Sequence, residues 1–418
     1  MPTTFRPAVE ADIPSIVDIE CRAFSRDTPE SRAHKQRELQ HELADYVALT
    51  DGPQIVAVAR IQPHWLRVGC CQVLKGDVGH VAVPPELHGQ GFGTTLMQRI
   101  IPHMRDHGFH LSRLGGLMKF YSRFGYEPFI RRYVHILVPH LDTPLKGQSW
   151  REMLDLPDAP LPHVRPYHPA RDRDAVHRLR YAFDATRSGQ IAIAPEPSGP
   201  ATGEPDPSGL RWVYDDGQIR GFLQGAYALV NAGDPGPSYR LDELIFDYSC
   251  PQAVPDLVKT YLQRAQDEAP TKLTCRLPYD EALFNALSEA NIACEVVEWR
   301  TANDGNMMLV VNLEGTLEAI LPELQERLGG LPQLPWEGNV RFVLPAGEAI
   351  LEVRGGEVGL TDSAADVVIR ASQADFIKWL FGIVGFAESP QAQALTPPQR
   401  LVLNLLFPRL PCASGPWG

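Results

Sequence analysis

Hydrophobic positions at the start of the chain alternate between helical and strand-like spacing. The run AVEADIPSIVDIECRAF places apolar residues on one helical face, whereas IVAVARIQ and CCQVLKGDVGHVAV are typical of buried strands. A glycine-rich stretch then leads into a predicted helix, TTLMQRIIPHMRDHG, which ends at Gly108. Strands that alternate with helices in this way favour a mixed α and β fold.

The middle of the chain repeats this outline. VRPYHPARDRDAVHRLRYAF is similar to the opening FRPAVEADIPSIVDIECRAF: each has an Arg-Pro strand end and then an amphipathic helix. Further on, YRLDELIFDYS and AVPDLVKTYLQRAQDEA repeat the strand and helix that surround the glycine-rich stretch. This similarity suggests an internal duplication.

The last segment has a different pattern. MMLVVNL is strand-like, LEAILPELQERL is helical, and NVRFVLPAGEAILEVRGGEVGLTD predicts a strand meander with a Gly355-Gly356 turn. QADFIKWLFGIVG and PQRLVLNLLFP predict apolar helices, so this segment is α+β. Proline-rich residues 137–169 and a polar turn cluster at 301–306 separate the segments. We therefore predict three domains, at 1–147, 160–301 and 303–418.

The length of the chain agrees with several domains, and its net charge restricts the class of binding partner. A chain of 418 residues exceeds what one hydrophobic core normally supports. Its 39 basic against 51 acidic residues, a net charge of −12, argue against nucleic acid and fit a cationic small molecule. Residues 1–145 hold 16 basic and 15 acidic residues, and the remainder holds 23 and 36. The acidic excess therefore lies outside the first domain.

Cysteine usage and terminal sequence indicate the compartment. None of the seven cysteines forms a CxxC pair, which makes a zinc site and a disulfide framework improbable. The N-terminal residues lack the plan of a signal peptide, and no apolar run approaches the ~20 residues of a membrane span. We expect a cytoplasmic protein with no metal and no membrane contact.

The run VGHVAVPPELHGQGFGTTLMQRI contains the clearest chemical motif. A strand ends at Pro84-Pro85, glycines follow at 89, 91 and 93, and a helix begins at Thr94. Alternating glycines let backbone N–H groups face one concavity at a helix N-terminus, which suits a diphosphate. The run lacks the Lys-Ser/Thr of a P-loop and the spacing of a dinucleotide fingerprint. A tight strand-to-helix turn without a ligand is the alternative.

A second motif follows in LSRLGGLMKFYSRFGYEPF. His88-Gly89-Gln90-Gly91-Phe92-Gly93, together with the later Phe120-Tyr121 and Gly125-Tyr126, resembles the paired motifs of the GNAT acetyltransferase superfamily. The organisation of the whole chain resembles the enhanced intracellular survival (Eis) type of these enzymes. This resemblance implies an α+β protein with tandem GNAT-type α/β domains, the second degenerate, followed by a sterol-carrier-protein-like α+β domain.

The resemblance also implies roles for individual residues. Tyr121 would protonate the departing CoA thiolate as general acid, and the terminal carboxylate of Gly418 would be the general base or the anchor for the substrate ammonium. Acetyl-CoA would contact a strand, a loop and a bend, here Val81, Ala82, Val83, Gly89, Gln90, Gly91, Phe92, Gly93, Thr94, Gly116 and Leu117. His88 replaces the usual Arg or Gln of the loop, and Gly418 follows Trp417 where an aromatic last residue is expected.

The predicted activity is direct N-acetylation, in a ternary complex with acetyl-CoA, of a primary amine on an aminoglycoside-like or polyamine-like cation. The family resemblance implies a homohexamer. The alternative is a non-catalytic module that binds CoA or an apolar ligand.

A few other residues need separate interpretation. We interpret His80 as a hydrogen-bonded structural histidine, with a catalytic base as the alternative, and Tyr126 as a structural residue. Tyr248–Gln252, the equivalent of the glycine loop in the middle domain, has no glycine, so we expect no diphosphate site there. Asp242, Glu243 and Asp247 are candidates for an acidic wall of the substrate cleft, although plain surface charge is the simpler interpretation.

Overall fold

The computed structural model describes residues 3–129, 131–137, 152, 155–156, 161–185, 187–199, 201–204, 209–228, 238–267, 272–299, 304–329, 331 and 333–412. Of these, residues within 1–129 and 300–409 form one compact unit, and residues within 130–299 and 410–417 form the other. None of the helices in the described ranges combines the length and apolar composition that a bilayer crossing needs.

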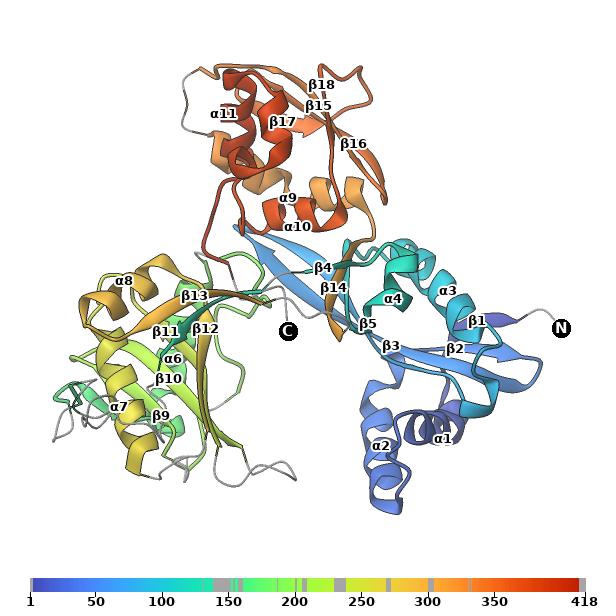
Figure 1. The fold of residues 1–418 in the computed structure, drawn as a ribbon, viewed down its shortest axis with the longest axis horizontal. Helices are drawn as coiled ribbons and strands as arrows, with labels where there is room; N and C mark the ends of the chain where they lie inside the picture. Colours follow the sequence, from blue (N-terminus) through green and yellow to red (C-terminus); the bar gives the residue numbers. More distant parts are fainter. Residues whose placement is uncertain are drawn as a thin grey trace. The chain divides into compact units, whose positions relative to one another are not determined.

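The first unit contains a sheet of seven described strands in the order β1-β2-β3-β4-β5-β14-β6 (Figure 1). All neighbouring strands pair antiparallel except β4 and β5, which are parallel. The strands are β1 (Thr4–Pro7), β2 (Tyr46–Asp51), β3 (Gln54–Val68), β4 (Cys71–Ala82), β5 (Leu111–Leu117), β6 (Glu127–Pro128) and β14 (Asp304–Val310). The helices connected to them are α1 (Ile13–Ala23), α2 (Pro29–Glu42), α3 (Phe92–Asp106) and α4 (Met118–Tyr121).

Alternation along β2 shows how this sheet is covered. Tyr46 and Ala48 pack in a cluster with buried residues of α1 and α2. Val47 and Leu49, which point to the other face, pack in a second cluster with α3. Because neighbouring strand residues face opposite sides, α1 and α2 cover one face of the sheet and α3 covers the other.

The rest of the first unit is a smaller α+β body. Its sheet has the order β17-β16-β15-β18, and the predicted meander is confirmed by the antiparallel pairs β15–β16 and β16–β17. Gly355 and Gly356 have positive φ angles in the turn between β16 and β17, as predicted. The elements are α9 (Leu313–Leu328), β15 (Gly338–Leu344), β16 (Gly347–Arg354), β17 (Glu357–Leu360), β18 (Val367–Arg370), α10 (Gln373–Leu380) and α11 (Pro397–Leu406).

The second unit is built around another sheet of seven described strands, in the order β13-β7-β12-β11-β10-β9-β8. Its strands are β7 (Arg131–Ile136), β8 (Val164–Pro166), β9 (Arg211–Asp215), β10 (Ile219–Ala228), β11 (Ser238–Phe246), β12 (Lys272–Pro278) and β13 (Cys294–Trp299). Its helices are α6 (Pro169–Ala185), α7 (Ala253–Asp267) and α8 (Glu281–Glu289).

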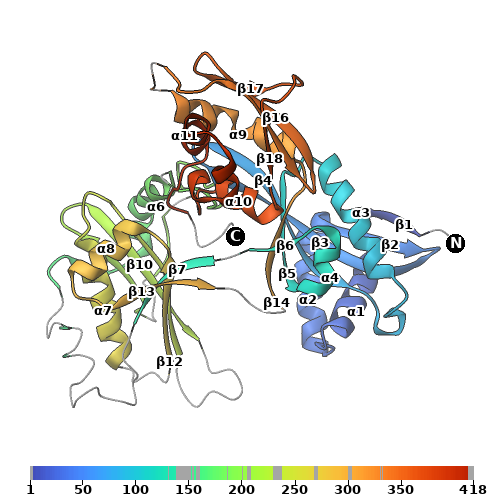
Figure 2. The ribbon, with the colours of Figure 1, turned by 45° about the horizontal axis from the view of Figure 1, so that its top comes forward.

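The two large sheets share one plan. Each begins with four antiparallel strands, and the fourth of them pairs in parallel with the next strand. These parallel pairs are β4–β5 in the first sheet and β11–β12 in the second. Next to that pair, the first sheet contains β14, which lies between β5 and β6 and comes from outside the run of chain that forms β1 to β6 (Figure 2). In the second sheet this place is taken by β7, the first strand of its run, which lies between β12 and β13.

These strand pairings divide the chain differently from the predicted domains. β7 lies within predicted domain 1–147 but pairs in the second sheet, and β14 lies within predicted domain 303–418 but pairs in the first. The predicted first and third domains also share one compact unit. Pairing between strands so distant in sequence leaves no local pattern from which it could be predicted.

A matching ion pair stabilises the start of each large sheet. The Arg6 guanidinium donates to both carboxylate oxygens of Asp12 at 2.6 and 2.9 Å, and Asp12 also accepts the Val9 N–H. Arg165 binds Asp172 in the same way at 2.8 and 3.1 Å, and Asp172 accepts the His168 N–H. The two similar sequence stretches therefore form the same local structure.

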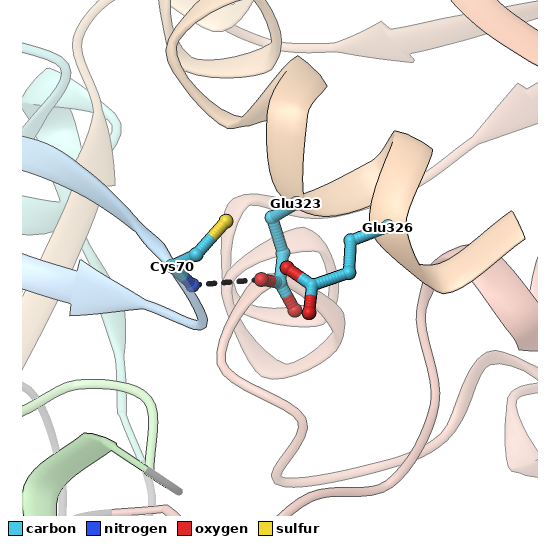
Figure 3. A group of neighbouring side chains, drawn as sticks. All are labelled: Cys70, Glu323 and Glu326. Carbon is cyan, nitrogen blue, oxygen red and sulfur yellow. Dashed lines mark hydrogen bonds between the residues drawn. The ribbon is translucent and has the colours of Figure 1, made fainter. Parts of the chain in front are cut away.

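The hairpin between β3 and β4 is attached to α9. The Cys70 N–H donates to Oε2 of Glu323 at 2.7 Å (Figure 3). Arg327 Nε donates to Oε1 of the same carboxylate. Cys70, Glu323 and Glu326 have ligand-type atoms within 4.8 Å of one another, the one such group among the described residues. Because both oxygens of Glu323 already accept hydrogen bonds, we interpret this group as an attachment between the hairpin and the helix.

Replacing Gly69 should weaken that attachment. Gly69 has a φ of +57°, and a Cβ added there would lie 1.9 Å from the Glu323 carboxylate. We expect Gly69→Ala to lower the free energy of unfolding by about 2–4 kcal/mol, because it combines backbone strain with a steric clash. Denaturant unfolding measures the change. Gly356→Ala is the control, since Gly356 has a φ of +78° but open space at Cβ; equal losses in both variants would contradict the clash.

Candidate active site

The parallel pair β4–β5 separates at one end. Its pairing begins at Lys75↔Leu111 and ends at Val78↔Leu114, although β4 continues to Ala82 and β5 continues to Leu117. Beyond Leu114, β5 keeps pairing with β14 on its other side. The edge of β4 that faces this separation therefore has backbone groups free for a ligand with amide groups.

The glycine loop continues from this strand end to the start of α3. Gly91 is the N-cap residue of α3 with a φ of 89°, and no side chain caps the helix. The first N–H groups of a helix have no partner within it, and the N-terminus has a partial positive charge. A Cβ added at Gly89 or Gly91 would meet nothing within 4 Å. The uncapped amides and the open space above them fit an anionic group such as a phosphate.

A pocket of about 530 Å³ joins the strand end, the loop and α4. Most of the predicted acetyl-CoA contacts line it together with Tyr121. The residues that line it are Val81, Val83, Leu87, His88, Gly89, Gly91, Phe92, Gly93, Thr94, Leu117, Phe120, Tyr121 and Arg123. The structure thus brings the two sequence motifs, about 30 residues apart in the chain, to one cavity.

Tyr121 is held in this pocket by aromatic contacts. Its ring packs edge-on against Phe120, with centroids 4.9 Å apart, and against Tyr126 at 6.4 Å. Burial raises the pKa of the Tyr121 phenol, so the hydroxyl keeps its proton at neutral pH. A protonated phenol in a largely buried position is suited to donate a proton to a leaving group.

Two pocket residues have functions that the sequence did not suggest. Arg123 places a positive charge at the pocket: its guanidinium donates to Thr94 Oγ1 at 3.0 Å and lies 5.4 Å from the Phe120 ring centroid. His88, which stands where Arg or Gln is usual, lies with Nε2 3.0 Å from the Val83 carbonyl oxygen. Since that oxygen can only accept, Nε2 donates. His88 therefore joins the loop to the strand, and Arg123 provides the cation.

Three predicted contact residues do not line the pocket. Ala82 is buried on the opposite face of the sheet, with α1 and α2. The Gln90 side chain donates to the Glu86 carbonyl oxygen. A Cβ on Gly116 would lie 3.0 Å from the Tyr121 ring, so this glycine makes room for that ring. Gly418 and Trp417 lie outside the described residues, and the role of the terminal carboxylate stays a prediction.

Tyr126 is fully buried, and its hydroxyl lies 2.7 Å from Ser112 Oγ, which donates to the Gly76 carbonyl oxygen. It is a core residue below the pocket, in agreement with the structural role assigned to it from the sequence.

The equivalent loop of the second unit has different contacts. The Ser249 N–H and hydroxyl both donate to Asp247 Oδ1, so a carboxylate of the chain occupies the position before α7. Asp247 also accepts from Arg220, Glu243 accepts from Arg180 and Asp242 accepts from Arg240. Each of the three candidate acidic residues is therefore neutralised by an arginine.

Comparison with known proteins gives a family match for the first part of the chain. Residues 4–129 match the family model of the acetyltransferase (GNAT) domain. Among solved structures, the chain is similar to a GCN5-related N-acetyltransferase from Anabaena variabilis, at 15% identity and a TM-score of 0.62 over 99% of each chain. One from Kribbella flavida gives 18% identity and a TM-score of 0.62 over 99% of this chain and 98% of that one. Eis1 from Mycobacterium abscessus gives 16% identity and 0.60 over 99% of each. A search of the curated proteins found no match.

Proposed function

Because residues 4–129 of this chain are a GNAT acetyltransferase domain, we propose that the protein transfers the acetyl group of acetyl-CoA to a primary amine of a cationic small molecule, directly, in a ternary complex. The observation that supports this most is a pocket that combines an open strand edge, uncapped helix amides, a cation and a buried phenol.

The pocket residues divide the binding of acetyl-CoA between them. Backbone groups of Val81, on the unpaired edge of β4, and the N–H of Val83, just beyond the end of β4, would hydrogen-bond the pantetheine arm, since the Val83 carbonyl oxygen already accepts from His88. The N–H groups of Gly89–Thr94 and the Arg123 guanidinium would bind the pyrophosphate. Charge-assisted hydrogen bonds of this kind are the strong ones in proteins. Leu117 and Phe120 would provide the apolar wall.

Acetyl transfer releases CoA as a thiolate, and the sulfur of this leaving group needs one proton. The amine nitrogen forms a bond to the acetyl carbonyl carbon, and the C–S bond breaks. Tyr121 would protonate the departing thiolate, since its buried hydroxyl is neutral at physiological pH.

The remaining parts of the proposal follow the family resemblance. The second unit, with its matching sheet plan and matching Arg–Asp pair, would be a degenerate GNAT domain. The body of α9, β15–β18, α10 and α11 would be a sterol-carrier-like domain, and the protein would be a cytoplasmic homohexamer.

A panel of amines tests the proposed acceptor class. Residues 146–418 have 13 more acidic than basic residues, and such an excess concentrates cations near the protein at low ionic strength. We expect spermine and kanamycin to react with kcat/KM at least ~10-fold above that of neutral amine or hydroxyl acceptors, and the advantage to shrink between 20 mM and 500 mM salt. Release of free CoA thiol measures the reaction.

Two outcomes of this experiment would contradict the proposal in different ways. Equal rates with neutral and cationic acceptors would contradict the cationic substrate while leaving the acetyltransferase activity. Binding of acetyl-CoA without thiol release for any amine would instead identify a non-catalytic CoA-binding module.

A further inference from the structure

The hairpin between β3 and β4 places two cysteine thiols side by side. Cys70 lies exposed in the turn of this hairpin, and Cys71 begins β4. Their Sγ atoms are 3.8 Å apart. Two sulfurs that each lie ~2.3 Å from a Zn²⁺ ion at the tetrahedral angle are also separated by about 3.8 Å. The two thiols are therefore spaced as two ligands of one tetrahedral ion.

Two carboxylates of α9 lie beside these thiols. Glu323 and Glu326 are three residues apart, so both lie on one face of the helix. Figure 3 shows their side chains directed toward the Cys70 thiol, and one donor atom from each of the three residues lies within 4.8 Å of the other two. A contraction of about 1 Å would bring these atoms to the spacing of ligands around zinc. The hairpin and the helix together offer two sulfur and two oxygen donors.

The hydrogen bonds of Glu323 orient it without preventing it from binding a cation. The Cys70 N–H and Arg327 Nε donate to different oxygens of this carboxylate, and each oxygen has two lone pairs. Glu323 is only 8% exposed, so these bonds fix one orientation. Carboxylates that ligate metals are themselves hydrogen-bonded in this way. The attachment between hairpin and helix therefore also holds a ligand in place.

The chemistry of the donors selects the class of ion. Desolvation and the neighbouring Glu323 and Cys71 side chains raise the pKa of the Cys70 thiol. The thiol thus keeps its proton at neutral pH, which makes it a poor nucleophile. The same negative surroundings attract a cation. Mg²⁺ and Ca²⁺ prefer oxygen ligands alone, whereas Zn²⁺ accepts thiolate and carboxylate together.

We propose that Cys70, Cys71, Glu323 and Glu326 bind one Zn²⁺ ion, which joins the β3–β4 hairpin to α9. The ion bonds to both sulfurs and to one oxygen of each carboxylate, and the two thiol protons pass to solvent. All four residues belong to the first compact unit, and none of them lines the acetyl-CoA pocket. The role of the ion is therefore structural and separate from the proposed acetyl transfer.

The pattern of cysteines along the chain gives no sign of this site. The absence of a CxxC pair argued against zinc, but here the two cysteines are adjacent and the remaining donors are glutamates. Glu323 lies 253 residues from Cys70. Only the packing of α9 against the hairpin brings the four donors together.

Titration calorimetry with Zn²⁺ under reducing conditions tests the site. We expect the wild type to bind one ion per chain and Cys70→Ser to weaken this binding by at least ~100-fold. Loss of a residue that only orients a ligand already costs about 10–100-fold in affinity, and loss of the ligand itself costs more. Serine keeps the backbone N–H that binds Glu323, so the variant should have the melting temperature of the metal-free wild type.

Further variants assign the other donors. Cys71→Ser and Glu326→Gln should each weaken Zn²⁺ binding by at least ~10-fold. Cys294→Ser and Glu314→Gln are the matched controls and should keep wild-type affinity. Cys294 is a partly exposed cysteine of β13 in the second unit, and Glu314 is an exposed glutamate in the first turn of α9.

Co²⁺, which replaces Zn²⁺ in many proteins, identifies the ligand atoms. Bound to thiolate, it gives a sulfur-to-cobalt charge-transfer band in the near ultraviolet, which the wild type should show and Cys70→Ser should lose. No Zn²⁺ binding by the wild type, equal binding by Cys70→Ser, or Co²⁺ binding without this band would overturn the assignment. Each of these measurements is independent of acetyl transfer, so none of them decides the proposed function.

Discussion

Gly91→Val is expected to weaken acetyl-CoA binding by at least ~100-fold in titration calorimetry. Gly91 is the N-cap residue of α3 and lines the pocket, and a Cβ there would project into open space. A valine side chain would therefore occupy the proposed phosphate position. Losing two hydrogen bonds to a charged group costs about 3 kcal/mol, which corresponds to this factor.

The backbone adds to the effect. Gly91 has a φ of 89°, a conformation that a β-branched residue avoids, so the loop would also change shape and misplace its N–H groups. Gly108→Val is the matched control, because Gly108 lies just beyond the other end of α3 with a φ of +77° and open space at Cβ. It should lower the melting temperature through similar strain and retain acetyl-CoA binding. Wild-type affinity in Gly91→Val would exclude residues 89–94 as the phosphate site.

Tyr121→Phe is expected to lower kcat by about 10²-fold and to leave the affinity for acetyl-CoA nearly unchanged. General acid catalysis typically contributes 10²–10⁴-fold, and a CoA thiolate is already a fair leaving group, which favours the lower value. The phenylalanine ring keeps the contacts with Phe120 and Tyr126, so only the proton donor is lost.

Tyr126→Phe is the control for this experiment. It removes a hydroxyl that hydrogen-bonds Ser112 in the core below the pocket. We expect a loss of about 1 kcal/mol in the free energy of unfolding and a kcat close to that of the wild type. If Tyr121→Phe instead reduced acetyl-CoA affinity at unchanged kcat, Tyr121 would be a packing residue, and the proton would have to come from another group.

Much of the local structure could be predicted from the sequence because it depends on short-range patterns. Apolar runs at Ile55–Gln62 and Cys70–Val83 predicted β3 and β4, and the Gly355-Gly356 pair predicted the turn between β16 and β17. The spacing of glycines 89, 91 and 93 after a strand predicted the loop before α3. The Arg-Pro strand ends predicted the similarity between the openings of the two large sheets, which the structure extends to matching Arg–Asp pairs.

Part of the candidate site could be predicted because it, too, depends on short-range sequence patterns. Both motifs are short, and the structure places Tyr121 with Val81, Val83, Gly91 and Leu117 around one cavity. Arg123 was not predicted, because it lies at the pocket only through the turn that follows α4. Glu243 and Asp247 appeared available in the sequence, whereas Arg180 and Arg220, which neutralise them, come from other parts of the second unit.

The sequence by itself determined which residues form strands, which loop leaves helix amides uncapped and which phenol follows β5, since these depend on periodicity, glycine spacing and neighbouring residues. Only the tertiary structure decided that β14 completes the first sheet and β7 the second, and that Glu20 of α1 meets His80 of β4. Strand pairs and side-chain contacts between distant segments depend on how the elements pack in three dimensions. The spacing of residues along the chain does not predict that packing.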